Sequence, residues 1–214
     1  MEDRSVTTFD RKQLAKELHS NIIKHFPRRR IMVPSIDSVW SADLVIMPNE
    51  KGYKYILTII DIFSKYSWCV PLKTKTGIEI TEAFKNIFSE SGRIAKKLWC
   101  DKGTEFYNKT FLKFLKDNNC ELYSTESELK ACVIERFNRT LKDLMYRKFT
   151  ELDDNKDWLK VLPELVNEYN NRYHSTIKMT PVDGSKKENE EQIKREVFTE
   201  EFSSKKPKFK KNDM

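Results

Sequence analysis

The fold of this chain is decided by residues 39–47, which read VWSADLVIM. A continuous run of mainly apolar residues, several of them β-branched or aromatic, is typical of a strand that is buried on both faces. The turn-forming stretch PNEKG follows at residues 48–52. A single acidic residue, Asp43, lies in the middle of the run. We therefore predict a buried strand that carries one carboxylate.

The segments after this strand alternate between strand and helix patterns. Residues 53–62 and 66–72 are rich in β-branched and aromatic residues and lie one short turn apart, which predicts an antiparallel meander with the first strand. Residues 76–91 have apolar residues at helical spacing, and Asn108 is a suitable cap for a second helix. Each of these helices is followed by a short apolar run, at residues 95–100 and 120–123. The predicted order is βββαβαβ.

Two further helices and two charged ends complete the chain. A long amphipathic helix is indicated by apolar residues at steps of three and four, namely Ile134, Phe137, Leu141 and Leu144. Another helix is expected over residues 155–173. Residues 1–37 are polar and basic and are expected to form a short helix over residues 10–24 and a linker. Residues 185–214 are rich in Lys and Glu and are expected to be disordered, which leaves a core domain over residues 38–184.

The composition limits the classes to which the chain can belong. It has 214 residues and a formal net charge of +7, which favours a polyanionic partner, although charge alone is a weak indication. No run approaches the roughly 18–20 apolar residues of a membrane span, and no apolar signal region opens the sequence. The cysteines form no CxxC pair, so we expect reduced thiols and no zinc module. They are Cys69, Cys100, Cys120 and Cys132.

Three carboxylates differ from their surroundings, and each has an alternative interpretation. A charged group in a buried strand is costly unless it is paired or binds a cation, so Asp43 needs a partner, for which a structural salt bridge is the alternative. Asp101 ends the fourth predicted strand, where Gly103 permits a sharp turn and an ordinary turn aspartate is the alternative. Glu135 lies one position from the apolar stripe of the long helix, where a solvated charged face is the alternative.

These carboxylates can converge on one point. If the first and fourth strands are neighbours, Asp43 and Asp101 lie side by side, and the long helix can bring Glu135 to them. Three unpaired carboxylates repel one another until hard cations that prefer oxygen ligands fill the space between them. Two such ions about 3.5–4 Å apart would activate an attacking oxygen and stabilise a leaving one. The pattern therefore predicts a site for two divalent metal ions.

The residues around the three carboxylates resemble the three motifs of the retroviral integrase superfamily, in the same order. The matching stretches are WSAD at residues 40–43, CDKGTEF at residues 100–106 and VIERFNRTLK at residues 133–142. Three stretches are similar to the sequences of integrases of Polinton (Maverick) transposons. They are LKACVIE at residues 129–135, the basic residues 28–30 and NRYH at residues 171–174. Thirty-three residues lie between Asp101 and Glu135, slightly fewer than is usual in the family.

This resemblance implies a fold, a reaction and a set of partners. The fold would be a ribonuclease H-like α/β fold with a five-stranded mixed sheet (βββαβαβα) flanked by helices. The enzyme would process DNA 3′ ends and transfer strands, with Asp43, Asp101 and Glu135 as catalytic residues that bind two Mg²⁺ or Mn²⁺ ions. It would act on element ends and target DNA as a homo-oligomer in the host nucleus, without a membrane or a small-molecule substrate.

Other polar residues have weaker assignments. Candidates for contact with DNA phosphates, with a solvated face as the alternative, are Lys130, Asn138, Arg139 and Lys142. Asp61 precedes a turn, a position that favours a backbone cap over a metal ligand. The histidines fit no metal-spacing pattern and are expected at the surface or in linkers. They are His19, His25 and His174.

Two alternative functions remain open. A ribonuclease that cleaves RNA–DNA hybrids has the same fold and chemistry, but that family normally presents a fourth acidic residue, which this sequence does not place. A domesticated, non-catalytic DNA-binding protein derived from an integrase would have kept the fold without the reaction. The absence of the zinc and barrel domains that often flank the family's core favours the domesticated DNA-binding protein. The three retained carboxylates speak against it.

Overall fold

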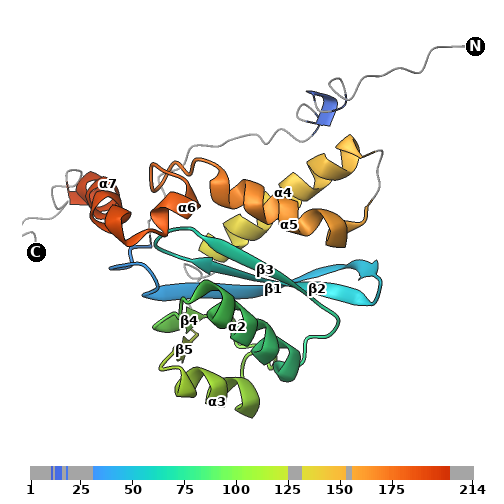
Figure 1. The fold of residues 1–214 in the computed structure, drawn as a ribbon, viewed down its shortest axis with the longest axis horizontal. Helices are drawn as coiled ribbons and strands as arrows, with labels where there is room; N and C mark the ends of the chain where they lie inside the picture. The colour runs from blue at the N-terminus through green and yellow to red at the C-terminus, as the bar shows by residue number, and fades with distance from the viewer. Residues whose placement is uncertain are drawn as a thin grey trace, which may run out of the picture.

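The structure, a computed structural model, describes residues 11, 13–15, 18, 31–124, 132–152 and 156–202, without the side chains of residues 198–202. It is built on a mixed sheet of five strands with helices on both faces (Figure 1). The strands are β1 (Val39–Glu50), β2 (Tyr53–Asp61), β3 (Ser67–Leu72), β4 (Lys97–Trp99) and β5 (Glu121–Tyr123). The helices beside the sheet are α2 (Gly77–Ser91), α3 (Lys109–Asp117), α4 (Cys132–Glu151) and α5 (Trp158–Asn171).

β1 lies in the middle of the sheet, whose order is β3-β2-β1-β4-β5. It is antiparallel to β2, with Asp43 opposite Thr58, and β2 is antiparallel to β3, which completes the predicted meander. On its other side β1 pairs in parallel with β4, and β4 pairs in parallel with β5. Parallel neighbours need a crossover, which α2 and α3 provide. The predicted five-stranded mixed sheet is confirmed.

The two crossover helices begin and end at capping residues. Thr76 precedes α2, and its hydroxyl accepts a hydrogen bond from the backbone N–H of Glu79 at 3.4 Å. The helix ends at Gly92, whose φ of 65° lies in the left-handed region that favours glycine. Asn108 caps α3 by accepting from the backbone N–H of Phe111 at 3.0 Å. α2 therefore lies within the predicted range of residues 76–91, and α3 begins directly after its predicted cap, Asn108.

The sheet separates two apolar cores because successive side chains of a strand point to opposite faces. In β2, Leu57 and Ile59 pack in the core that α2 and α3 cover, whereas Ile56 and Ile60 pack in the core that α4 and α5 cover. All four side chains are at most 1% exposed. This burial on both faces explains why the strand reads as a continuous apolar run.

β1 follows the same alternation and thereby orients its carboxylate. Trp40 and Ala42 belong to the core on the side of α2 and α3, and Val45 belongs to the core on the side of α4 and α5. Asp43 is two residues before Val45 and shares its face, which α4 covers (Figure 1). The sheet therefore presents Asp43 toward the helix that carries Glu135.

Beyond α5 the chain forms three more helical segments, which correct one prediction. They are α6 (Pro181–Gly184), η1 (Lys187–Asn189) and α7 (Glu190–Phe202). The expectation of disorder from residue 185 onward is wrong for residues 187–202. Ile193 in α7 is 1% exposed and packs in a third apolar cluster with Val39 and Ile62. One buried isoleucine among Lys and Glu residues gives too weak a periodic signal to be recognised in the sequence.

The remaining expectations about the chain as a whole can be compared only with the residues that the structure describes. Residues 11, 13–15 and 18 are helical, within the helix predicted over residues 10–24. The basic residues 28–30 and the tail from residue 203 lie outside the described part. In that part no helix is long and apolar enough to cross a membrane. The four cysteines are free thiols, as expected.

Candidate active site

The parallel pair of β1 and β4 determines how two of the three predicted carboxylates lie. The last paired residues of these strands are Ser41 and Trp99. Asp43 and Asp101 each come two residues later, so they lie level with one another just beyond the point where the pairing of β1 and β4 ends. The prediction that the first and fourth strands are neighbours is confirmed.

Asp43 is a partly buried carboxylate that is held from two directions. One of its oxygens accepts a hydrogen bond from the backbone N–H of Leu44 at 2.8 Å, and the other accepts from Nδ2 of Asn138 on α4 at 2.7 Å. Its backbone carbonyl accepts from the Thr58 hydroxyl of β2 at 3.2 Å. Within the described ranges Asp43 forms no ion pair. The structural salt bridge that was its alternative explanation is therefore absent from this part of the chain.

The surroundings of Asp43 disfavour its negative charge. Burial is the largest cause of a raised pKa of Asp43, and the nearby carboxylates of Asp101 and Glu135 raise it further. The hydrogen bonds from Leu44 and Asn138 lower the pKa but do not cancel these effects. Asp101 and Glu135 therefore both lie close enough to repel the carboxylate of Asp43, a situation that a bound cation would relieve.

Asp101 is exposed in the loop after β4. Its Oδ1 accepts from the backbone N–H of Gly103 at 3.3 Å, as in an Asx turn. Gly103 has no left-handed φ, so the turn does not depend on the conformational freedom of glycine. A β-carbon at this position would instead lie 2.4 Å from the side chain of Glu105. Glycine thus provides space for Glu105, which folds over the loop that carries Asp101.

Glu135 is exposed in the first turn of α4, and Asn138 lies three residues further along the helix. Asn138 is only 8% exposed because its amide reaches down to Asp43. Its Oδ1 atom is buried and has no hydrogen-bond partner among the described residues. A buried polar atom without a partner is costly, and a bound cation would satisfy this oxygen. The sequence assigned Asn138 to DNA and gave no sign of its contact with Asp43.

The donor set fits a hard divalent cation in its chemistry. All three groups are carboxylates, and none of them forms an ion pair in the part of the chain that is described. In the described ranges no group of three His, Cys, Asp or Glu side chains is placed to hold a metal ion. The three carboxylates are therefore spaced more widely than the ligands of an assembled metal centre. The predicted carboxylates therefore share one neighbourhood without forming a closed ligand cluster.

The four residues predicted to contact DNA differ in position. Arg139 and Lys142 are exposed on α4 at four and seven residues from Glu135, which places them on the same side of the helix. Asn138 is buried and already donates to Asp43. Lys130 lies outside the described residues.

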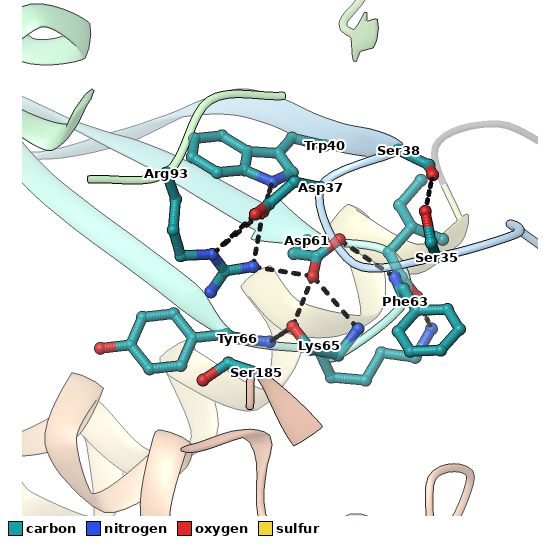
Figure 2. Close-up of polar contacts among 12 residues, drawn as sticks. Ser35, Asp37, Ser38, Trp40, Asp61, Phe63, Lys65, Tyr66, Arg93 and Ser185 are labelled. Carbon is teal, nitrogen blue, oxygen red and sulfur yellow. Dashed lines mark hydrogen bonds and ion pairs between the residues drawn. The ribbon is translucent and has the colours of Figure 1, made fainter. Parts of the chain in front are cut away.

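A second charged cluster, which the sequence did not indicate, lies beside the start of β1 (Figure 2). Nη2 of Arg93 is 2.6 Å from Oδ1 of Asp37 and 2.9 Å from Oδ2 of Asp61. The guanidinium group also lies over the rings of Tyr66 and Trp68, at 5.4 and 5.0 Å from their centroids. We call Arg93, Asp37 and Asp61 the arginine cluster.

The arginine cluster joins three segments that lead into or out of strands of the sheet. Asp37 precedes β1 and accepts from Nε1 of Trp40 at 2.8 Å. Asp61 ends β2 and accepts from the backbone N–H groups of Phe63 and Ser64, both at 3.3 Å, which confirms its predicted role as a backbone cap. The cluster thus ties β1 to β2 through the segment that leads into β4, the strand that ends two residues before Asp101.

His174 lies in the segment that links α5 and α6, as expected of a linker residue, but not at the surface. It is partly buried, its Nδ1 accepts from the backbone N–H of Thr176 at 3.3 Å, and it pairs with Met179 in an isolated β-bridge. His19 and His25 lie outside the described residues.

Comparisons of the sequence with known proteins point to one kind of domain. The family described as integrase core domain matches residues 35–127. A transposon-derived protein of Caenorhabditis elegans is 36% identical over 135 residues, which are 63% of this chain and 47% of that protein. The Gag-Pol polyprotein of feline leukemia virus is 28% identical over 151 residues, which are 69% of this chain and 9% of the polyprotein. The matches therefore span less than half the length of either relative.

Solved structures give the same answer for the fold. The HTLV-2 integrase catalytic core domain in complex with magnesium matches with a TM-score of 0.60 at 20% identity, over 70% of this chain and 97% of that one. A simian T-cell lymphotropic virus intasome matches with a TM-score of 0.62 at 19% identity, over 77% of this chain and 60% of that one. The fold is thus the ribonuclease H-like fold of retroviral integrase catalytic cores, as predicted.

Proposed function

We propose that this chain is the catalytic core of a DNA integrase. Residues 35–127 match the integrase core domain, and the chain is similar to retroviral polyproteins and to a transposon-derived protein. Its reaction would be metal-dependent 3′-end processing followed by strand transfer. The observation that carries this proposal is the level placement of Asp43 and Asp101, with Glu135 near enough to raise the pKa of Asp43.

Each of the three carboxylates has a distinct place in the proposed mechanism. Asp43, Asp101 and Glu135 would hold Mg²⁺ or Mn²⁺, which when bound would activate the attacking oxygen and stabilise the leaving one. Asp43 lies on the central strand and is fixed by its bonds to β2 and α4. Asp101 lies on a loop, and Glu135 lies on a helix. Asn138 is a positioning residue, because its amide orients Asp43 and does not itself face the solvent.

The DNA contacts belong to the same side of α4. Arg139 and Lys142 are exposed next to Glu135 and would attract phosphates without reading the base sequence. Lys130, just before the helix, is proposed to act in the same way. The net charge of +7 agrees with a polyanionic substrate.

The finer assignment is to integrases of the Polinton (Maverick) type, and it rests on residues 129–135 and 171–174. Joining two DNA ends to a target requires at least two active subunits, so we propose a homo-oligomer. The substrate would place the protein in the nucleus of the host cell.

The proposal is tested by strand joining on a branched DNA that mimics an integration product, with Mg²⁺ or Mn²⁺ and without either. Glu135→Gln is expected to reduce the metal-dependent rate by about a hundredfold or more, because it removes one metal-binding charge. Glu90→Gln is the matched control, since Glu90 is exposed on α2 and outside the site. It should retain the wild-type rate.

Other outcomes identify the alternative functions. If the wild-type chain and Glu135→Gln are equally inactive although both are folded and bind DNA, the chain is a non-catalytic DNA-binding protein. Metal-dependent cleavage of the RNA strand in an RNA–DNA hybrid, without joining of DNA, would identify a ribonuclease.

A further inference from the structure

A cavity of about 620 Å³ lies between α4 and the segment that follows α5. None of Asp43, Asp101 and Glu135 lines it. Its volume is within the range of small-molecule binding sites in proteins, about 300–1,000 Å³. Besides two tyrosines, the ionisable groups on its wall are Lys65, Arg136, Asp143, Arg147, Arg172 and His174.

The cavity uses a different side of α4 from the candidate active site. Arg136, Thr140, Asp143 and Arg147 line it, and their spacings of four, three and four residues form one stripe along the helix. The active-site residues Asn138 and Lys142 do not belong to this stripe. α4 therefore has two polar sides, one toward the candidate active site and one toward the cavity.

The charges on the cavity wall are strongly unbalanced. Four cationic side chains and one carboxylate, Asp143, leave three positive charges when His174 is neutral. Asp143 and Arg147 already have other interactions. The guanidinium groups of Arg136 and Arg172, by contrast, are exposed and form no hydrogen bond or ion pair in the described part of the chain. Two arginine side chains are thus available at the opening.

The inner groups of the cavity are affected by this excess of positive charge. Lys65 is 8% exposed and donates to the carbonyl of Ile62 at 2.6 Å. Burial, together with a smaller effect of the charge of Arg136, lowers the pKa of Lys65 to about 8 against the opposing effect of Asp61. Burial also lowers the pKa of His174 to about 4, with contributions from Lys65 and Arg136. An anion bound in the cavity would attract the protonated forms of Lys65 and His174 and would therefore raise the pKa of both groups.

We propose that this cavity binds a small phosphorylated molecule with two or more phosphate groups. Guanidinium groups bind phosphate through paired hydrogen bonds, and Arg136 and Arg172 supply two of them at the opening. Lys65 supplies a further positive charge at the inner wall. The rings of Phe137, Tyr169 and Tyr173 also line the cavity and provide an apolar wall for the rest of the ligand. The partially enclosed shape suits a compact ligand rather than a flat macromolecular surface.

The experiment is a calorimetric titration of the full chain with sodium tripolyphosphate, pyrophosphate and inorganic phosphate. We expect saturable binding of tripolyphosphate at one per chain, with affinity that decreases as phosphates are removed. The double variant Arg136→Gln/Arg172→Gln should weaken tripolyphosphate binding by about tenfold or more, since two charged hydrogen-bonding groups are lost. Arg195→Gln, an exposed arginine of α7 outside the cavity, should change it less than twofold.

A second measurement reports on the interior of the cavity. The ring signals of His174, identified by their absence in His174→Gln, should show a pKa that rises when tripolyphosphate is bound. An unchanged pKa of His174, or equal weakening by Arg195→Gln and by the double variant, would show that the anion binds elsewhere. Displacement of tripolyphosphate by a short DNA duplex at lower concentration would assign the cavity to DNA phosphates and overturn the small-molecule proposal. None of these measurements depends on strand joining, so they fail or succeed independently of the integrase activity.

Discussion

The arginine cluster and the candidate active site hold buried carboxylates in opposite ways. Asp61 is fully buried, and it has the guanidinium of Arg93 at 2.9 Å and two backbone N–H groups around it. Asp43 is partly buried on the neighbouring strand, and its nearby charges are the like charges of Asp101 and Glu135. Both carboxylates have a raised pKa with burial as the largest cause. The negative charge of Asp61 is compensated by the cation Arg93, whereas that of Asp43 has no cation of the described part of the chain beside it.

This difference separates a structural carboxylate from a candidate ligand. A carboxylate that only stabilises the fold is satisfied by groups of the protein, as Asp61 is. A carboxylate that serves a cation has to remain uncompensated until the cation arrives, as Asp43 is in this structure. Burial alone does not distinguish the two cases, whereas the presence of a cationic partner does, because Asp61 has Arg93 beside it and Asp43 has no such cation among the described residues.

The largest expected effect comes from removing the compensating cation. Arg93→Ala leaves Asp61 buried without an ion pair and should lower the free energy of unfolding by about 3–5 kcal/mol. Urea unfolding monitored by circular dichroism measures it. Arg93→Lys should recover part of the loss, because it keeps the charge but not the planar group that bonds to Asp37 and Asp61. A loss below about 1 kcal/mol in Arg93→Ala would remove the distinction between the two clusters.

A smaller effect is expected at His174, an uncompensated base beside the cations Lys65 and Arg136. Its pKa in the folded chain, about 4, lies below its ordinary value of 6.5, so the unfolded chain takes up the proton first as the pH falls. This contribution to stability is therefore complete above about pH 6.5 and is lost as the pH falls toward 4, by about 3 kcal/mol. Urea unfolding of wild type and His174→Gln across this range measures the difference. Parallel curves for the two chains would contradict the prediction.

The smallest expected effect is a change in the free energy of unfolding that has opposite signs for Asp43→Asn and Asp61→Asn. Asp43→Asn should raise the free energy of unfolding at pH 7 by about 1 kcal/mol, because a neutral amide avoids the burial and repulsion that raise the pKa of Asp43. Asp61→Asn should lower it, because Arg93 loses a partner. Mn²⁺ should stabilise the wild type and not Asp43→Asn, since only the former keeps the full ligand set. Destabilisation by both substitutions would make Asp43 a structural residue.

Local patterns in the sequence predicted most of the sheet and its crossover helices. The strands were recognisable because residues such as Ile56 and Leu57 are buried on opposite faces. The helix α2 was recognisable because Thr76 and Gly92 mark its ends. These signals lie within a few residues of the elements that they define. α7 was missed because Ile193 is its one fully buried apolar residue among the side chains described.

The candidate site was predicted less completely because it depends on contacts between distant segments. The level placement of Asp43 and Asp101 followed from the order of the strands. Asn138 was assigned to DNA because nothing nearby in the sequence indicates its bond to Asp43, which is 95 residues away. Arg93 was overlooked for the same reason, since Asp37 and Asp61 are 56 and 32 residues away from it. The roles of the site residues themselves stay predictions.

The place where the pairing of β1 and β4 ends has a mechanical consequence. The last pair is Ser41 with Trp99, so Asp101 lies in unpaired backbone, while Asp43 remains paired with Thr58 on the other side. One carboxylate is therefore anchored in the rigid middle of the sheet, and the other can change its distance from it without breaking a sheet hydrogen bond. Any adjustment of the separation between the two carboxylates therefore falls on the loop that carries Asp101 rather than on the core of the sheet.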